Sequence, residues 1–179
     1  MDLEEFKRNF QTRKVELQKI LKEIDEPIIT LNEGINNAYR FFWMRRLHQS
    51  SIIISLYTKI HDGKLVGGEL IFKEIAKSWW SKPFQVEKRI ERQILESEIK
   101  LLENHLEEMN FWNFPEVDSR IGLDGSDWIF EAKNRDKYHI ARRWSPVHEE
   151  TLKDFSSCGI YLLQLSGIDL NDRKYSPFI

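Results

Sequence analysis

The stretch GLDGSDWIFEAKNRDKYHIARRWSP, residues 122–146, decides the fold because its alternating residue types predict a β-hairpin. Alternate side chains of a strand point to opposite faces of a sheet. A three-residue loop would pair Lys133 with Lys137 and would turn the indoles of Trp128 and Trp144 toward one core. The charged side chains would then gather on the reverse face of the hairpin.

On that reverse face, the predicted register places acids opposite bases. Glu131 lies opposite His139, and Asp127 lies opposite Arg143. Asp124, in the preceding Gly-Leu-Asp-Gly turn, is placed to join them. One interpretation is a set of cross-strand ion pairs on a solvated face, worth about 0.2–1 kcal/mol each. The other is a binding patch that also includes adjacent tryptophans, made of Asp124, Asp127, Glu131, His139, Arg143, Trp79 and Trp80.

The same stretch suggests a catalytic histidine. Glu131 would orient His139 and raise its pKa, as a nearby negative charge does, so that the imidazole could act as a base. A hydrolase also needs a nucleophile, and Ser126 and Ser145 lie at the ends of the predicted strands. Nothing in the sequence places either hydroxyl within reach of His139.

A second catalytic hypothesis concerns a metal. Glu131-Ala-Lys133 with an upstream acid resembles the core of PD-(D/E)xK nucleases, in which acids hold Mg²⁺ and the lysine assists the attacking water. Asp118 and Asp124 are the candidate upstream acids. The tripeptide is short, and the formal net charge of −2 offers no general attraction for a phosphate backbone. The nuclease is therefore the alternative hypothesis, and the leading one has no catalytic residue, metal or cofactor.

The rest of the chain predicts an α+β fold in which an antiparallel sheet of about five or six strands is packed by two helices. Residues 2–25 show the three-four spacing of an amphipathic helix, which is followed by Pro27. β-Branched and aromatic residues predict further strands, and apolar residues at helical spacing predict the two packing helices. The strands are expected at 38–48, 50–60, 64–76 and 84–94, and the helices at 96–110 and 148–165.

Composition limits the class of protein. The chain has 179 residues, of which 41% are hydrophobic and 31% charged, so it is expected to fold in water as one domain with a helical extension. We expect an N-terminal helix at 1–27, an α+β domain at 38–168 and a loosely held polar tail at 169–179. The single cysteine, Cys158, excludes an internal disulfide, and the acidic first residues do not form a signal peptide. A cytoplasmic location is expected.

Four blocks carry a resemblance to a known group of proteins. They are YRFFWMRRLH at 39–48, LEEMNFWNFP at 106–115, the stretch at 122–146 quoted above, and YLLQLSGI at 161–168. In order and spacing they resemble a family of small bacterial proteins with no established activity. The resemblance covers residues 39–168, and it implies fold boundaries but no catalytic roles.

The sequence therefore predicts a non-enzymatic domain that binds another protein, rather than nucleic acid or a membrane. An immunity or inhibitor-type factor in bacterial conflict is the specific form of this hypothesis. Small size, mild acidity and the aromatic and charged hairpin favour it.

Overall fold

The computed structural model describes residues 3–32, 34–45, 49–76, 83–118, 120, 125–135 and 137–177. Within these residues the chain forms six strands and three α-helices, and all neighbouring strands are antiparallel. The predicted α+β class with an antiparallel sheet is confirmed. The strands are β1 (Asn37–Arg45), β2 (Ser51–His61), β3 (Lys64–Ala76), β4 (Gln85–Ile94), β5 (Ser126–Asn134) and β6 (Lys137–Trp144).

The strand order β4-β3-β2-β1-β5-β6 combines a meander with one crossover. β1 to β4 pair in sequence, and the chain then returns to the free side of β1 to form the hairpin of β5 and β6. β1 and β5 consequently lie side by side within the sheet, and β6 forms the edge next to β5. This pairing places Arg40 directly opposite Glu131, two residues that are far apart in the sequence.

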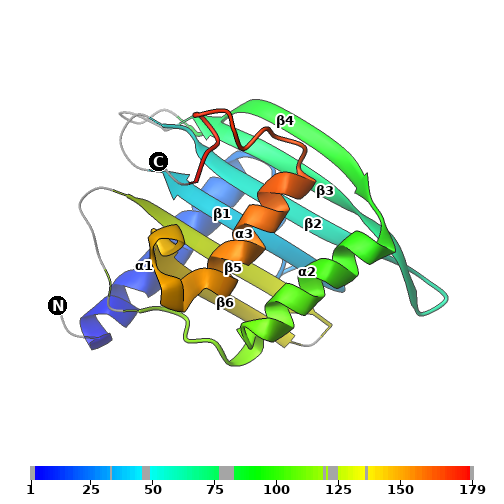
Figure 1. Ribbon diagram of the computed structural model, residues 1–179, viewed down its shortest axis with the longest axis horizontal. Helices are drawn as coiled ribbons and strands as arrows, with labels where there is room; N and C mark the ends of the chain where they lie inside the picture. Colours follow the sequence, from blue (N-terminus) through cyan, green and yellow to red (C-terminus); the bar gives the residue numbers. More distant parts are fainter. Residues whose placement is uncertain are drawn as a thin grey trace.

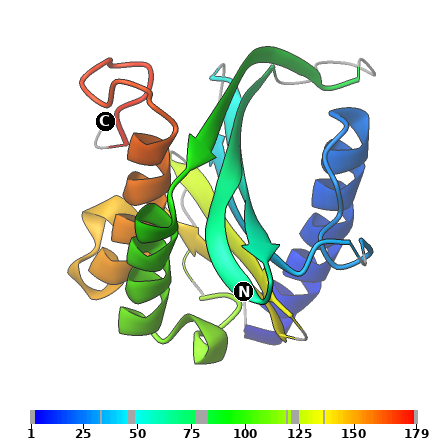
Figure 2. The ribbon, with the colours of Figure 1, turned by 90° about the vertical axis from the view of Figure 1, so that its right-hand side faces the viewer.

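Helices cover both faces of the sheet. α1 (Leu3–Glu23) lies on one face, and α2 (Glu96–Glu108) and α3 (Lys153–Leu165) lie on the other (Figures 1 and 2). We call these the α1 face and the α2/α3 face. None of the helices in the described ranges is long and apolar enough to cross a membrane.

The larger core lies on the α2/α3 face. Trp128 of β5 is fully buried there, and its ring contacts Phe41 edge to face at 4.9 Å. α3 packs closely on this indole at Gly159, where an added Cβ would lie 2.5 Å from Trp128 Cζ3. Glycine is thus the residue that lets the helix backbone approach the aromatic core.

A smaller core lies on the α1 face. Four buried residues of the N-terminal segment recur at the three-four spacing of one helical face, and they pack on aliphatic and aromatic side chains of the sheet. Both faces of the central strands are therefore buried. The members from the N-terminal segment are Leu17, Ile20, Leu21 and Ile24, and the main members from the strands are Phe42, Ile53, Ile75, Ile129 and Ile140.

Within its described part the C-terminal segment contacts the sheet at one point, while residues 171–174 are exposed. Tyr175 is buried in the larger core, and its hydroxyl donates to Glu74 at 3.0 Å. Lys174 forms an ion pair with Glu74 at 3.0 Å.

Candidate functional site

A buried arginine lies on the α1 face, in the middle of an otherwise apolar strand. Arg40 is 1% exposed, and each of its three side-chain nitrogens has an acceptor. Nη1 donates to Glu131 Oε2 at 2.8 Å, and Nε donates to Ser55 Oγ at 3.0 Å. Nη2 donates to the carbonyl of Pro27 at 2.6 Å and to Tyr57 Oη at 3.2 Å. The guanidinium thus joins β1, β2, β5 and the segment after α1.

A second buried cation and a second buried acid extend this network. Glu26, just after α1, lies 2.6 Å from Lys73 Nζ and 3.6 Å from Arg40 Nη2. Lys73 also donates to the carbonyls of Ile24 and Asp25 at 3.0 and 3.1 Å. Burial alone would raise the pKa of Glu26, but the charge of Arg40 and the hydrogen bond from Lys73 outweigh burial and lower it. The network fixes the C-terminal end of α1 on the sheet with its charges balanced.

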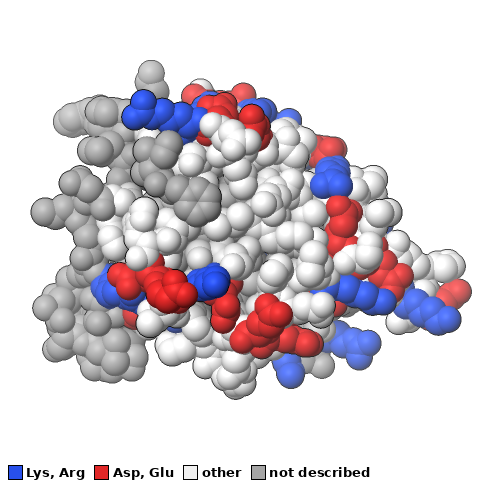
Figure 3. Space-filling view, in the orientation of Figure 1, with Lys and Arg blue, Asp and Glu red and all other residues white. Residues whose placement is uncertain are grey.

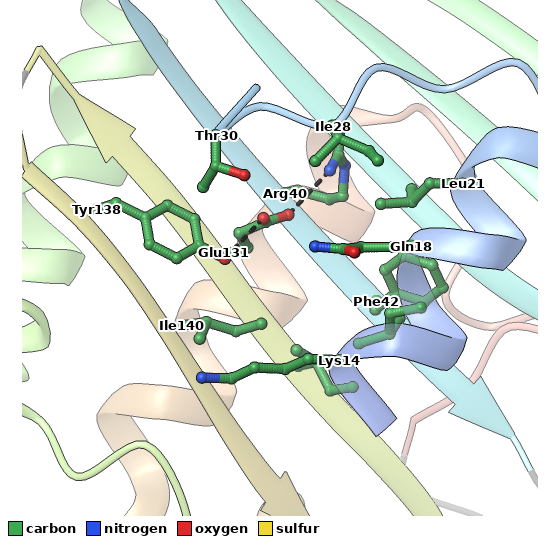
Figure 4. A pocket seen from close by; sticks show the side chains of 12 residues that line it. Lys14, Gln18, Leu21, Ile28, Thr30, Arg40, Phe42, Glu131, Tyr138 and Ile140 are labelled. Atoms are coloured by element: carbon green, nitrogen blue, oxygen red, sulfur yellow. Dashed lines mark hydrogen bonds and ion pairs between the residues drawn. The ribbon is translucent and has the colours of Figure 1, made fainter. Parts of the chain in front are cut away.

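A cavity of about 170 Å³ lies next to this network, between α1 and the sheet (Figure 4). Apolar cavities of about 150 Å³ are large enough to hold a benzene ring, so this one can accept a single side chain or a small ring. Half of its lining is apolar and half is polar. The apolar residues are Leu17, Leu21, Ile28, Phe42, Ile129 and Ile140, and the polar ones are Lys14, Gln18, Thr30, Arg40, Glu131 and Tyr138.

The polar end of the cavity is fixed by hydrogen bonds. Tyr138 Oη donates to Glu131 Oε1 at 2.9 Å, while Arg40 occupies Oε2 of the same carboxylate. Burial and, next, the charge of Glu131 raise the pKa of Tyr138, so the phenol stays protonated although the residue is 42% exposed. Glu131 has a strong partner on each oxygen. A carboxylate whose two oxygens both accept hydrogen bonds is better suited to binding a partner than to transferring a proton.

A salt bridge involves Lys14, one of the residues that line the cavity. Lys14 Nζ lies 3.0 Å from Glu116 Oε2, which links α1 to the segment after α2. That segment borders β6, because the carbonyl of Glu116 accepts from the backbone N–H of Arg142. The cavity is lined by α1, by the segment after it and by strands β1, β5 and β6, and the loop that contains Glu116 lies beside β6.

The observed hairpin register differs by one residue from the predicted one. β5 and β6 pair Asn134 with Lys137 across a two-residue turn, in which Arg135 has φ 52° and donates its N–H to the carbonyl of Asn36. The prediction assumed one core and therefore one apolar side per strand. In the structure both faces are covered, and Ile140 belongs to the smaller core.

This register separates the predicted patch into two halves. Glu131 lies opposite Ile140, and Ala132 lies opposite His139, so Glu131 and His139 are on different faces. Asp127 forms a buried ion pair with Arg142 rather than the predicted pair with Arg143.

The two tryptophans also separate. Trp128 pairs with Arg143, and Trp144 pairs with Asp127 at the next position, so the two indoles do not start from the same face of the hairpin. Trp79, Trp80 and Asp124 lie outside the described residues. The shared surface on which the predicted patch depended is not formed.

His139 is not placed as a catalytic base. Its Nε2 is 2.8 Å from the carbonyl of Phe114, and its ring contacts Phe111 edge to face at 4.9 Å. Burial lowers the pKa of His139, whereas the predicted contact with Glu131 would have raised it. Ser145, one of the two serines at the strand ends, accepts through Oγ from the backbone N–H of Ser126 at the far end of the hairpin.

The nuclease arrangement is not formed by Asp118. Its carboxylate lies 2.9 Å from Arg120 Nε and 3.8 Å from Arg143 Nε, on the opposite face of the hairpin from Glu131. Lys133 donates to the carbonyl of Asn32 at 3.2 Å. Across the described ranges, no group of three or more His, Cys, Asp or Glu side chains is placed to hold a metal ion.

Sequence reasoning missed the buried network, although the sequence contains a signal for it. Arg40 interrupts the run AYRFFW, and Lys73 interrupts LIFKEI, so each of these two short runs carries one basic residue. A charged residue at the centre of a buried strand requires a partner. Glu131 was singled out as the cross-strand partner of His139, whereas in the structure its ion-pair partner is Arg40.

No protein-family model matches the chain, and no curated protein shows significant similarity to it.

Proposed function

We propose that the protein is a non-catalytic domain that binds another protein, and that the partner docks on the α1 face and inserts one side chain into the cavity. The observation that carries this proposal is the cavity itself, which is the size of one ring and has a fixed polar end. A buried pocket filled by an anchor side chain is how many interfaces obtain most of their binding energy.

The charges around the cavity favour an uncharged anchor. Arg40 is paired with Glu131, and Lys14 is paired with Glu116, so both basic lining residues already face an acid. A charged side chain would disturb one of these pairs and would lose its own hydration. An aromatic or aliphatic side chain with one polar atom fits, because Tyr138 Oη and the carboxamide of Gln18 line the same space.

The surface around the cavity continues the apolar contact. Ile28 lines both the cavity and a shallower hollow on the other side of the segment after α1. Leu31, which lines that hollow, is 72% exposed. An exposed leucine next to the cavity offers a docked partner additional apolar area to bury.

The opposite side of the molecule does not favour nucleic acid as the partner. Figure 3 shows positive and negative side chains interleaved around a broad uncharged area on the side covered by α2 and α3. Phosphate backbones bind surfaces on which positive charge is concentrated. The mixed charges and the net charge of −2 support a protein partner.

The narrower form of the proposal is an immunity or inhibitor-type role in bacterial conflict. The chain is small and mildly acidic, and both properties suit a factor that occupies a surface of a larger, basic protein. Purified protein should then suppress the activity of the bound partner at a one-to-one ratio. A partner whose activity is unchanged in the complex would limit the proposal to binding alone.

Site-specific photo-cross-linking tests the docking face. A photoreactive amino acid is placed at Leu31 on the α1 face, or at Leu101 of α2, which is 45% exposed on the other side of the sheet. Cross-linking in cells of the source is followed by identification of the partner and by titration of the two purified proteins. We expect a specific product from position 31 and none from position 101.

A variant that blocks the cavity provides the decisive comparison. Thr30 is exposed and lines the cavity, so Thr30→Trp should block it without disturbing the core. We expect the affinity for the purified partner to fall at least about tenfold, which corresponds to about 1.4 kcal/mol, while the circular dichroism spectrum is unchanged. Unchanged affinity in Thr30→Trp, or a partner cross-linked only from position 101, would contradict the proposed docking face.

A further inference from the structure

A second cavity lies at the opposite end of the central strands, away from the Arg40–Glu131 pair. Its volume is about 510 Å³, which is within the range of small-molecule sites. It lies where β1 ends and β5 begins, and the C-terminal segment at 173–177 closes one side of it. Arg45 of β1 and Ser126 of β5, which pair in the sheet, both line it.

The lining of this second cavity is positively charged. Four basic residues line it, namely Arg45, His148, Arg173 and Lys174, and none of its lining residues in the described ranges is acidic. The carboxylate of Glu74 lies behind the lining and pairs with Arg45 at 3.4 Å and with Lys174 at 3.0 Å. One carboxylate therefore faces two fixed cations, and the exposed Arg173 adds a third. The excess of positive charge attracts an anion.

A buried donor without an acceptor points independently to a ligand. Trp43 lines the cavity and is 4% exposed, and its Nε1 has no hydrogen-bond partner among the described residues. Buried indole N–H groups almost always have an acceptor, and leaving one unsatisfied is unfavourable. The guanidinium of Arg45 lies over the same ring, 5.1 Å from its centre. An oxygen atom bound here would satisfy the N–H next to a positive charge.

The other wall of the cavity is shaped by a close backbone contact. Gly125 has φ 147°, and a Cβ at this position would lie 2.3 Å from Ser145 Oγ and 2.8 Å from Trp144 Cζ2. Only glycine lets this backbone lie against the second indole. The cavity thus has two aromatic lining residues, Trp43 and Trp144, together with its basic residues.

We infer that this cavity binds a small organic anion, a flat ring that carries a phosphate or carboxylate group. The anionic group accepts from Trp43 Nε1 and is held by the positive charge of Arg173 and Lys174, while the ring lies against the indoles. Phosphate and carboxylate share the charge and the acceptor oxygens, so the structure defines this common chemistry. The site is separate from the proposed protein-docking face.

Calorimetric titration with defined probes tests the inference. Adenosine 5′-monophosphate and indole-3-acetate carry the two anionic groups on a flat ring, adenosine carries the ring without the charge, and inorganic phosphate carries the charge without the ring. We expect one of the two ring anions to bind at least tenfold more tightly than adenosine or phosphate. Which of them binds distinguishes a phosphate ligand from a carboxylate ligand.

Two variants and one spectroscopic signal locate the binding. Arg173→Ala changes an exposed residue and should weaken binding of the anion at least tenfold. Lys100→Ala, which changes an exposed side chain of α2, should leave binding of the anion unchanged. The indole N–H resonance of Trp43, assigned by its loss in Trp43→Phe, should shift on addition of the anion. The inference would be overturned if neither ring anion binds, or if adenosine or inorganic phosphate binds as tightly as the ring anions. It would also be overturned if a ring anion binds but the Trp43 resonance does not shift and Arg173→Ala does not lower the affinity. Thr30→Trp should bind the anion normally, because it alters the other cavity.

Discussion

Replacement of Glu26 by glutamine tests whether the buried charge network holds α1 on the sheet. The side chain of Glu26 is 1% exposed and lies 2.6 Å from Lys73 Nζ and 3.6 Å from Arg40 Nη2. Glutamine keeps the size and shape of the side chain but removes its negative charge. Arg40 then keeps one carboxylate partner, that of Glu131, while Lys73 keeps only neutral acceptors.

The environment of Lys73 sets the expected magnitude. Its side chain is 1% exposed, and after the substitution its charged partner is replaced by neutral oxygens, including the carbonyls of Ile24 and Asp25. Breaking a buried pair by removing one partner typically costs about 3–5 kcal/mol, because the other charge stays buried. The glutamine oxygen can still accept a hydrogen bond, so we expect a loss near the lower end, about 3 kcal/mol. The free energy of unfolding of a typical domain is about 5–15 kcal/mol, so this loss would be a large fraction of the total.

Urea unfolding followed by circular dichroism measures this loss. The set comprises Glu26→Gln, Lys73→Met and the double variant, which removes both charges and keeps the network neutral. We expect the double variant to be destabilised by about 2 kcal/mol less than the sum of the single variants, since neither charge is left alone. Glu91→Gln is the control, because it breaks the half-exposed pair with Arg89 and should change stability by less than about 0.5 kcal/mol.

The pH dependence of the same variant gives an independent measurement. Arg40 and Lys73 lower the pKa of Glu26 below its ordinary value of 4.5, despite its burial. The stabilisation from this carboxylate is therefore present above pH 4.5 and is lost as the pH falls through the lower, folded pKa. Glu26→Gln should lose less stability than the wild type over this acid range. A cost below about 1 kcal/mol at pH 7, or single variants whose effects simply add, would refute the coupling between the two charges.

The remaining predictions concern the contact of α3 with the core and the buried histidine. Gly159→Ala should destabilise the protein by about 1–3 kcal/mol, because the new Cβ would lie 2.5 Å from Trp128 and this overpacking exceeds the gain in helix propensity. Ser157→Ala, on the half-exposed side of the same helix, gains propensity only, so equal unfolding free energies for the two variants would contradict the close contact. Burial lowers the pKa of His139 below 6.5, so its neutral form is favoured in the folded state, and this stability is present above pH 6.5 and lost as the pH falls. His139→Gln keeps a donor for Phe114 and should flatten the dependence of the unfolding free energy on pH in this range, whereas an unchanged slope would show that the imidazole titrates normally.

The sequence predicted the strands because their signal is local. The runs around Phe41, Ile53 and Phe72 are β-branched or aromatic, and such residues favour pleated, buried backbone wherever the strand lies. The order of the strands could not be predicted in the same way. The pairing of β1 with β5 depends on the crossover through α2, and no short segment encodes it.

The sequence identified the hairpin that carries part of the site, but not the contacts that the hairpin makes with other strands. Glu131 and Tyr138 lie on the hairpin that the sequence singled out, but they meet because the turn has two residues rather than three. That difference of one residue moves every side chain of β6 to the other face. The predicted partner, His139, therefore lies on the α2/α3 face, and Arg40 occupies its place from another strand.

The cavity and the buried network have a common physical origin. Arg40 and Glu131 lie beneath α1, between the helix and the sheet. Aliphatic side chains alone would pack there without leaving space, whereas an ion pair requires donors and acceptors at fixed distances. The residues that form hydrogen bonds with Arg40 and Glu131 come from the sheet and from the segment after α1. The middle of α1 therefore lies over the cavity without filling it. It follows that replacing both charges with leucine should allow α1 to pack more closely and should reduce the cavity, even if stability is unchanged or higher. If the cavity serves binding, this variant should fold well and bind the partner poorly, which separates the contribution of the network to function from its contribution to stability.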